Sequence, residues 1–186
     1  MVLRVISGTL RGKKLNTLPG SEIRPTADRT KESIFNVLSD SVREAQVLDL
    51  FAGTGSLSIE ALSRGARQVV AIDKSRSAIE VIRKNLAACR MSEQVRLVEW
   101  DIIRNLDCIK ASIPPFTLVF MDPPYAAPAI EPALSNLHSC GALKIGAVVV
   151  IEHDFRVAAP ETRYGFNLCD KRKYGKTLVS FFRYMI

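Results

Sequence analysis

The residues best suited to chemistry in this chain are Asp122, Pro123, Pro124 and Tyr125, which directly follow the apolar run 116–121. Such a run predicts a buried strand, and in open α/β sheets ligands bind just beyond the carboxyl ends of the strands. The two prolines have no backbone N–H, so this turn offers carbonyl oxygens and one carboxylate as acceptors beside an aromatic face. The corner suits a planar ring that carries an exocyclic amine.

A second motif lies upstream at residues 49–60, with the sequence DLFAGTGSLSIE. It predicts a strand, a glycine turn and a helix. Gly53 and Gly55 have no Cβ, so the turn can bend sharply and let backbone approach a ligand at the start of the helix. Ser58 stands where a dinucleotide-binding fingerprint has its third glycine, which disfavours NAD.

The elements that would position these motifs alternate as a parallel α/β fold requires. Expected strands span 47–51, 69–72, 95–100, 116–121 and 147–152, and expected helices span 56–64, 75–89, 102–110 and 129–140. Two further strands, 166–171 and 177–184, are too close together for a helical crossover, so they must pair antiparallel. The prediction is a mostly parallel, seven-stranded sheet that ends in an antiparallel hairpin.

The first 45 residues precede this core. Residues 2–18, with Gly8 and Gly12, predict a short basic β-hairpin. A helix should follow, with Thr26 as its N-cap after Pro25 and an apolar stripe from Ile34 to Val42. We expect one domain over residues 1–186, made of this extension (1–45) and a catalytic core (46–186).

Basic residues are concentrated at the two ends of the chain. The net charge is +7, with seven Lys or Arg against two acidic residues in 1–31, six against two in 160–186, and 13 against 15 in between. Segregation of this kind favours binding to a polyanion, most simply nucleic acid, although solvated termini are the alternative.

Composition excludes several classes of protein. Hydrophobic residues make up 47% of the chain, which is ample for one core, yet no run reaches the roughly 18 residues needed to cross a bilayer. The start of the chain has no signal-peptide core, so we expect a cytoplasmic protein without membrane contact. The four cysteines lie far apart and the two histidines are isolated, so we predict no metal site.

A parallel sheet that ends in a hairpin, with a glycine turn after its first strand, resembles the Rossmann-like fold of class I S-adenosylmethionine-dependent methyltransferases over residues 46–186. The resemblance implies S-adenosylmethionine as cofactor and S-adenosylhomocysteine as product. Asp73 would accept the ribose hydroxyls, Lys74 would pack along the adenosine, and Asp101 and Ile102 would hold the adenine. The implied cofactor-binding residues are Asp49, Gly53, Gly55, Asp73, Lys74, Asp101 and Ile102.

A narrower resemblance covers nearly the whole chain. The segments 4–15, 24–29, 35–36 and 172–177, together with the two motifs above, are similar in type and order to the RsmD-type methyltransferases. That family methylates N2 of one guanine in small-subunit (16S) ribosomal RNA. The resemblance implies that Asp122 and Pro123 accept the N–H groups of the guanine amine and that Tyr125 stacks on the extruded base.

The same resemblance assigns the basic ends to ribosomal RNA, on an assembled or assembling 30S particle, with the protein acting as a monomer. Phosphate contacts supply affinity and register but no sequence choice. The residues expected to make them are Arg4, Arg11, Lys13, Lys14, Arg24, Arg29, Arg172, Lys173 and Lys176, with support from Lys171.

Three other functions stay open on the sequence. An adenine-N6 methyltransferase acting on DNA or RNA would use the residues 122–125 equally well. A non-catalytic RNA-binding assembly factor could retain the same fold. A nicotinamide oxidoreductase is disfavoured by Ser58 and by the absence of an obvious acid for hydride transfer.

Overall fold

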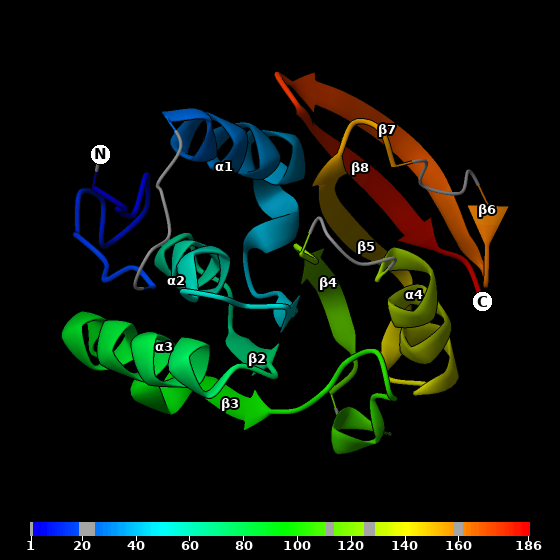
Figure 1. The fold of residues 1–186 in the computed structure, drawn as a ribbon, viewed down its shortest axis with the longest axis horizontal. Helices are drawn as coiled ribbons and strands as arrows, with labels where there is room; N and C mark the ends of the chain where they lie inside the picture. Colours follow the sequence, from blue (N-terminus) through cyan, green and yellow to red (C-terminus); the bar gives the residue numbers. More distant parts are fainter. Residues whose placement is uncertain (1, 19–24, 111–113, 125–128, 158–161) are drawn as a thin grey trace.

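The structure is a computed structural model that describes residues 2–18, 25–110, 114–124, 129–157 and 162–186. Arg24 and Tyr125, two residues of the predicted sites, lie outside these ranges. Figure 1 shows a central twisted sheet with helices packed on both of its faces. The predicted α/β class is confirmed.

The sheet has eight strands in the order β3-β2-β1-β4-β5-β8-β7-β6. The first five in this order are parallel to one another, while β8, β7 and β6 add antiparallel, as the sequence predicts. The eighth strand, β6, is a two-residue addition to the predicted seven. The strands are β1 (Gln46–Leu50), β2 (Gln68–Asp73), β3 (Val95–Glu99), β4 (Phe116–Met121), β5 (Leu143–Asp154), β6 (Thr162–Arg163), β7 (Phe166–Tyr174) and β8 (Thr177–Tyr184).

In the described part of the chain, α1 and η1 precede the first strand and the other helical elements connect strands. They are, with η marking a 3-10 turn, α1 (Pro25–Leu38), η1 (Ser39–Val42), α2 (Ser56–Ser63), α3 (Arg76–Cys89), η2 (Ser92–Gln94), η3 (Asp107–Ile109) and α4 (Ile130–Ser139). The helix expected over 102–110 is only η3 with adjoining turns. The prediction of Thr26 as N-cap was also wrong. Pro25 is itself the first helical residue, a position where its missing N–H costs nothing.

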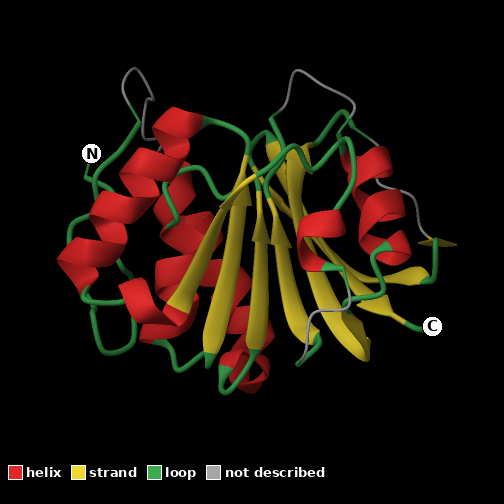
Figure 2. Ribbon diagram, turned by 90° about the horizontal axis from the view of Figure 1, so that it is seen from below, coloured by secondary structure: helices red, strands yellow, loops and turns green. Residues whose placement is uncertain are grey.

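Apolar side chains form one core layer on each face of the sheet. Figure 2 shows the sheet and the helices that cover it from another side. One layer contains the buried residues of α1, α2 and α3 together with Val47, Phe120 and Val150. The other contains those of α4 with Leu48, Met121 and Ile151. Because side chains alternate along a strand, neighbouring residues of each buried parallel strand belong to opposite layers.

Residues 2–18, the described part of the amino-terminal extension before α1, fold back on themselves with a single antiparallel bridge, Arg4 with Lys14, and no regular strand. The predicted hairpin is therefore present only in irregular form: the N–H groups of Val5, Gly12 and Leu15 donate to the carbonyls of Lys13, Val5 and Leu3 at 3.0, 2.9 and 2.9 Å. Other backbone donors of this segment are directed to α2: Ile6 and Ser7 donate N–H groups to the Glu60 carboxylate at 2.7 and 3.0 Å. The extension is thus fixed to the helix that follows the glycine turn.

Candidate active site

The strand register brings three predicted acidic residues to the carboxyl edge of the sheet. β1 lies between β2 and β4, and its last residue, Leu50, pairs with Ile72 on one side and Met121 on the other. Asp73 and Asp122 directly follow those partners in the chain, and Asp49 precedes Leu50. The two motifs that the sequence places far apart therefore meet at one edge.

The glycine turn at this edge has the conformation that only glycine adopts without strain. Gly53 and Gly55 have φ of +56° and +73°. A Cβ at Gly55 would also lie 3.2 Å from the Ile82 side chain, so the turn packs against α3. Gly53 donates its N–H to Asp73 Oδ2 at 2.9 Å, which ties the turn to the end of β2.

Asp73 holds the positions of two backbone groups. Its second oxygen accepts the N–H of Ser75 at 2.8 Å, where Ser75 caps α3. A carboxylate has about four lone-pair sites, so Asp73 can hold this turn and still accept hydroxyl groups of a ligand. The residue is partly exposed, as the predicted ribose contact requires.

Asp49 is 1% exposed and accepts two hydrogen bonds from Ser58. Burial, together with smaller contributions from the charges of Asp122 and Asp73, raises the pKa of Asp49 to about 7 despite those bonds. Asp122 and Asp73 therefore lie close enough to Asp49 for their charges to act on its carboxyl group. Sequence reasoning used Ser58 only to disfavour NAD and missed its contact with Asp49.

Asn85 is a second residue that sequence reasoning missed. It is fully buried on α3, donates to the Thr54 carbonyl at 2.9 Å and accepts the Asn16 N–H at 2.7 Å. It therefore joins the glycine turn to the amino-terminal extension. The sequence does place this amide beside the apolar stripe of the helix expected over 75–89. Since a buried amide needs hydrogen-bond partners, that position could have indicated a structural contact.

Asp122 stands at the end of β4 with its backbone N–H 3.4 Å from the Leu50 carbonyl. Asp122 is exposed as a residue, but the protein atoms around its carboxyl group partly desolvate that group. That desolvation, reinforced by the charge of Glu152, raises the pKa of Asp122 well above its ordinary value. Pro123 is buried beside it. The residues 122 and 123 thus form a fixed corner, while Tyr125 lies outside the described part of the chain.

The predicted adenine site is a shallow hollow of about 420 Å³ beside the ends of β2 and β3. Lys74 and Asp101 both line it, together with Trp100. Asp101 is exposed and accepts the N–H of Ile103 at 3.1 Å. Ile102 is 2% exposed and belongs to the core layer that contains α4, so its contact with a ring stays a prediction.

Three of the predicted RNA-binding residues surround a second hollow, of about 360 Å³, between the extension and α1. Arg4, Arg11 and Arg29 line it, and Arg4 forms an ion pair with Asp28 at 3.4 Å. Lys13 and Lys14 are exposed on the same extension. Asp28 and Glu32 line the same hollow, and contact of its arginines with phosphate stays a prediction.

The carboxyl-terminal basic residues lie on the hairpin of β7 and β8, whose turn is only Gly175 and Lys176. Arg172 pairs with Asp170 at 2.9 Å, and the Lys173 ammonium lies 4.6 Å from the centre of the Phe155 ring. The Tyr174 hydroxyl is hydrogen-bonded to Ser33 of α1. This bond joins the two basic ends of the chain, and Figure 1 shows the hairpin tip beside α1.

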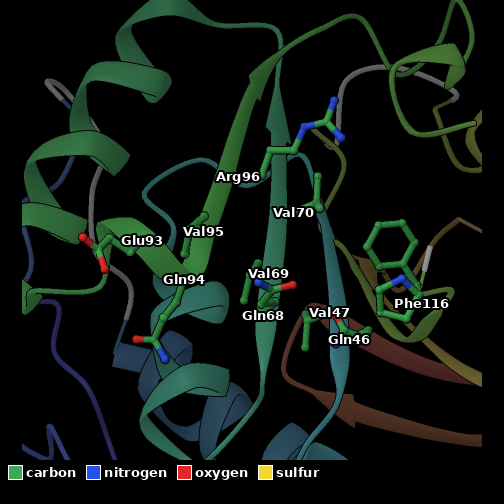
Figure 3. Close-up of a pocket in the computed structure, with 11 residues that line it drawn as sticks. Gln46, Val47, Gln68, Val69, Val70, Glu93, Gln94, Val95, Arg96 and Phe116 are labelled. Carbon is green, nitrogen blue, oxygen red and sulfur yellow. The ribbon is translucent and has the colours of Figure 1, made fainter. Parts of the chain in front are cut away.

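A further cavity, of about 510 Å³, opens at the opposite edge of the sheet (Figure 3). Gln46, Gln68 and Gln94 stand there at the amino ends of β1 and β2 and just before β3. Its charged lining residues are one carboxylate, Glu93, and one guanidinium, Arg96, and the rest are amides and apolar side chains, so it has no counterpart to the group of carboxyl residues at the carboxyl edge. We therefore place the chemistry at the carboxyl edge.

None of the helices in the described ranges combines the length and apolar character needed to span a membrane. No group of three or more His, Cys, Asp or Glu side chains in the same ranges is arranged to hold a metal ion.

Known proteins resemble this chain over most of its length. The family model described as "Conserved hypothetical protein 95" matches residues 3–183. Proteins named "Ribosomal RNA small subunit methyltransferase D" are similar: that of Haemophilus influenzae is 37% identical, covering 81% of this chain and 78% of its own, and that of Escherichia coli K12 is 32% identical, covering 94% and 86%.

Solved structures share the whole fold. The structure of yhhF from Escherichia coli superimposes with a TM-score of 0.84 at 31% identity, covering 100% of this chain and 99% of that one. SMU.776, solved in complex with SAH, gives a TM-score of 0.67 and covers 87% of this chain and 50% of its own. At 13% identity that second likeness concerns the fold alone.

Proposed function

The chain belongs to the Conserved hypothetical protein 95 family and is a ribosomal RNA methyltransferase, and we propose that it methylates the exocyclic N2 of one guanine in small-subunit (16S) RNA. The methyl donor is S-adenosylmethionine, and the substrate is an assembled or assembling 30S particle. The observation that carries the proposal is the meeting of the glycine turn, Asp73 and Asp122 at one edge of the sheet.

The described residues fit this cofactor. The turn at Gly53 and Gly55 has no side chain to block a ligand, and a Cβ at Gly53 would meet no side chain within 4 Å. Asp73 would accept the ribose hydroxyls, and the hollow with Lys74 and Asp101 would take the adenine. S-adenosylmethionine, when bound, supplies a methyl carbon activated by a sulfonium.

Residues 122 and 123 would prepare the attacking nitrogen. An exocyclic amine of a base is a weak nucleophile, because its lone pair is delocalised into the ring. The Asp122 carboxylate and the Pro123 carbonyl would accept its two N–H bonds, which directs the lone pair away from them and stabilises the positive charge that grows on nitrogen. The raised pKa of Asp122 also suits it to take the proton that the amine finally loses. Tyr125 would stack on the base.

The basic surfaces would hold the RNA around this corner. The bond between Ser33 and Tyr174 keeps the terminal hairpin on α1, and α1 also borders the hollow that Arg4, Arg11 and Arg29 line. RNA that contacts one basic end is therefore near the other. We assign Lys13, Lys14, Arg24, Arg172, Lys173 and Lys176 to the same footprint.

Three broader features complete the proposal. The chain acts as one domain, with residues 1–45 as an RNA-binding extension of the core 46–186. It acts as a monomer, because the particle it binds is far larger than the enzyme. It works in the cytoplasm, where that particle is assembled, and uses no metal.

A transfer assay with tritiated S-adenosylmethionine tests the proposal. Purified protein is offered small subunits, naked 16S RNA, large subunits and DNA in parallel. We expect label in the small subunits and none in DNA or large subunits. The matched variant Asp122→Ala should bind the cofactor, measured by calorimetry, and transfer less than about one thousandth of the label.

Other results would overturn the assignment. Label in DNA but not in small subunits would favour the adenine-N6 activity. Absence of cofactor binding by the wild-type protein would favour a non-catalytic assembly factor. Unchanged transfer by Asp122→Ala would remove Asp122 from the reaction.

A further inference from the structure

Glu152 stands beside Asp122 on the neighbouring strand. β4 and β5 are parallel, and the last residue pair in their register is Met121 with Ile151. Asp122 and Glu152 directly follow these two residues, one after each strand position, and so lie at the same level of the sheet. Glu152 is held within regular structure there, because β5 continues to Asp154 and pairs Glu152 with Val179 of β8.

Both side chains face the same layer. Phe120 and Val150 belong to the core layer that contains α1, whereas Met121 and Ile151 belong to the opposite layer. Side chains alternate along each strand, so residue 122 shares the side of Phe120 and residue 152 the side of Val150. Desolvation of the Asp122 carboxyl group raises its pKa, and the negative charge of Glu152 adds to this effect. Glu152 is only partly exposed.

A second carboxylate at this place distinguishes between bases. The Watson–Crick edge of guanine presents the N2 amine and, next to it, the N1–H donor, whereas adenine presents its N6 amine next to N1, which is an acceptor. Residues 122 and 123 can serve either amine. A carboxylate beside Asp122 gains a hydrogen bond from guanine and meets only lone-pair repulsion from adenine.

We propose that Glu152 accepts the N1–H of the target guanine while Asp122 and Pro123 hold its N2 amine, so that Glu152 is the residue that selects guanine over adenine. The inference rests on the proposed function and deepens it. Glu152 and Asp122 repel each other in the free enzyme, and positive charge growing on the amine relieves that repulsion. Glu152 therefore contributes to both the choice of base and the rate of transfer.

The test compares guanine with 2-aminopurine, which keeps the amine on C2 but has an acceptor at N1. Small subunits are reconstituted with either base at the methylated position, and kcat/KM is measured for each. Wild-type protein should prefer guanine by at least about tenfold, because 2-aminopurine replaces the N1–H donor with an acceptor that faces the Glu152 carboxylate. In Glu152→Gln, whose amide can donate or accept, the preference should shrink to within about threefold.

Control variants separate selection from folding. Glu80→Gln, an exposed carboxyl on α3 away from this edge, should keep the wild-type preference. Glu152→Asp keeps the charge and should keep the sign of the preference with a lower rate. Calorimetry should give the same cofactor affinity for all of these proteins.

The outcomes are distinguishable. If Glu152→Gln keeps the wild-type preference, the role of Glu152 is wrong while the proposed function stands. If wild-type protein prefers 2-aminopurine or does not distinguish the two bases, the inference also fails. If wild-type protein methylates neither reconstituted particle, the proposed function fails, and the inference falls with it.

Discussion

Ser58 donates both its backbone N–H and its hydroxyl to one oxygen of Asp49, at 3.2 and 2.5 Å. The first turn of α2 is thereby fixed to the strand that precedes the glycine turn, so both ends of the turn are held. The cost of this arrangement is a carboxyl group buried close to two others, and it makes the stability of the protein dependent on pH.

Asp49→Asn should flatten that dependence. The pKa of Asp49 is raised from an ordinary 3.8 to about 7 in the folded protein, so between these values the folded state keeps a proton that the unfolded chain has lost. The free energy of unfolding contributed by this group therefore falls as pH rises from about 4 to about 7, by roughly 2–4 kcal/mol. Urea denaturation of both proteins across this range measures the difference. Parallel curves would contradict the assignment.

Glu60→Ala should release the amino-terminal extension. The Glu60 carboxylate is fully buried and accepts Ile6 and Ser7 N–H groups, Arg64 Nε at 2.8 Å, and an ion pair from Lys31 at 3.6 Å. Removing it leaves the buried Lys31 ammonium without its counter-charge, which should cost about 3–5 kcal/mol. Hydrogen exchange should become faster over residues 2–16.

The control for that variant is Glu80→Ala. Glu80 also faces an arginine one helical turn away, but this pair is exposed and 3.9 Å apart. Its loss should change the free energy of unfolding by less than about 0.5 kcal/mol. Equal effects of the two substitutions would show that the buried Glu60 network does not hold the extension.

The rate of methyl transfer should decrease on the acid side of its pH profile, and this decrease, the acid limb, should lie at a higher pH than for an ordinary carboxyl group. The reaction needs ionised Asp122, and desolvation together with Glu152 raises the pKa of that carboxyl group. The rate should therefore fall as pH decreases through the raised pKa, above the range of an ordinary carboxyl group. In Glu152→Gln the limb should move toward lower pH, because one negative charge is removed. Single-turnover rates from about pH 5 to 9 test this, and a limb in the same place in both proteins would contradict it.

Arg11→Ala and Arg29→Ala should weaken binding to small subunits in a salt-dependent way. Both arginines line the hollow between the extension and α1. If each contacts one phosphate, each variant should lower the slope of log affinity against log salt by about 1. The matched control is Arg76→Ala on α3, an exposed arginine that does not line the hollow, whose slope should equal that of wild type. An unchanged slope for all three would remove the hollow from the RNA footprint.

Much of this architecture follows from local sequence patterns. The apolar run 116–121 and the glycine turn of residues 49–60 predict β4 and the β1–α2 unit because short buried strands and glycine turns are encoded by adjacent residues. The antiparallel end follows from the shortness of the connection between β7 and β8. The same patterns place Asp73 and Asp122 at strand ends, whereas their meeting depends on the pairing of β1 with β2 and β4.

The parts that the sequence did not predict depend on contacts between distant residues. The extension lacks a full hairpin because Glu60, far along the chain, takes the N–H groups of Ile6 and Ser7. The role of Asn85 depends on Asn16 and Thr54 together. In the sequence, nothing distinguishes Glu152 from its neighbours in β5. Only the pairing of β4 with β5 places it beside Asp122.

The central claim is tested most directly by mass-spectrometric mapping of small-subunit RNA from cells whose only copy of this protein carries Asp122→Ala. We predict that one N2-methylguanosine found with the wild-type protein is absent and that all other methylated nucleotides remain. Small-subunit RNA that keeps every methylated guanine would contradict the account.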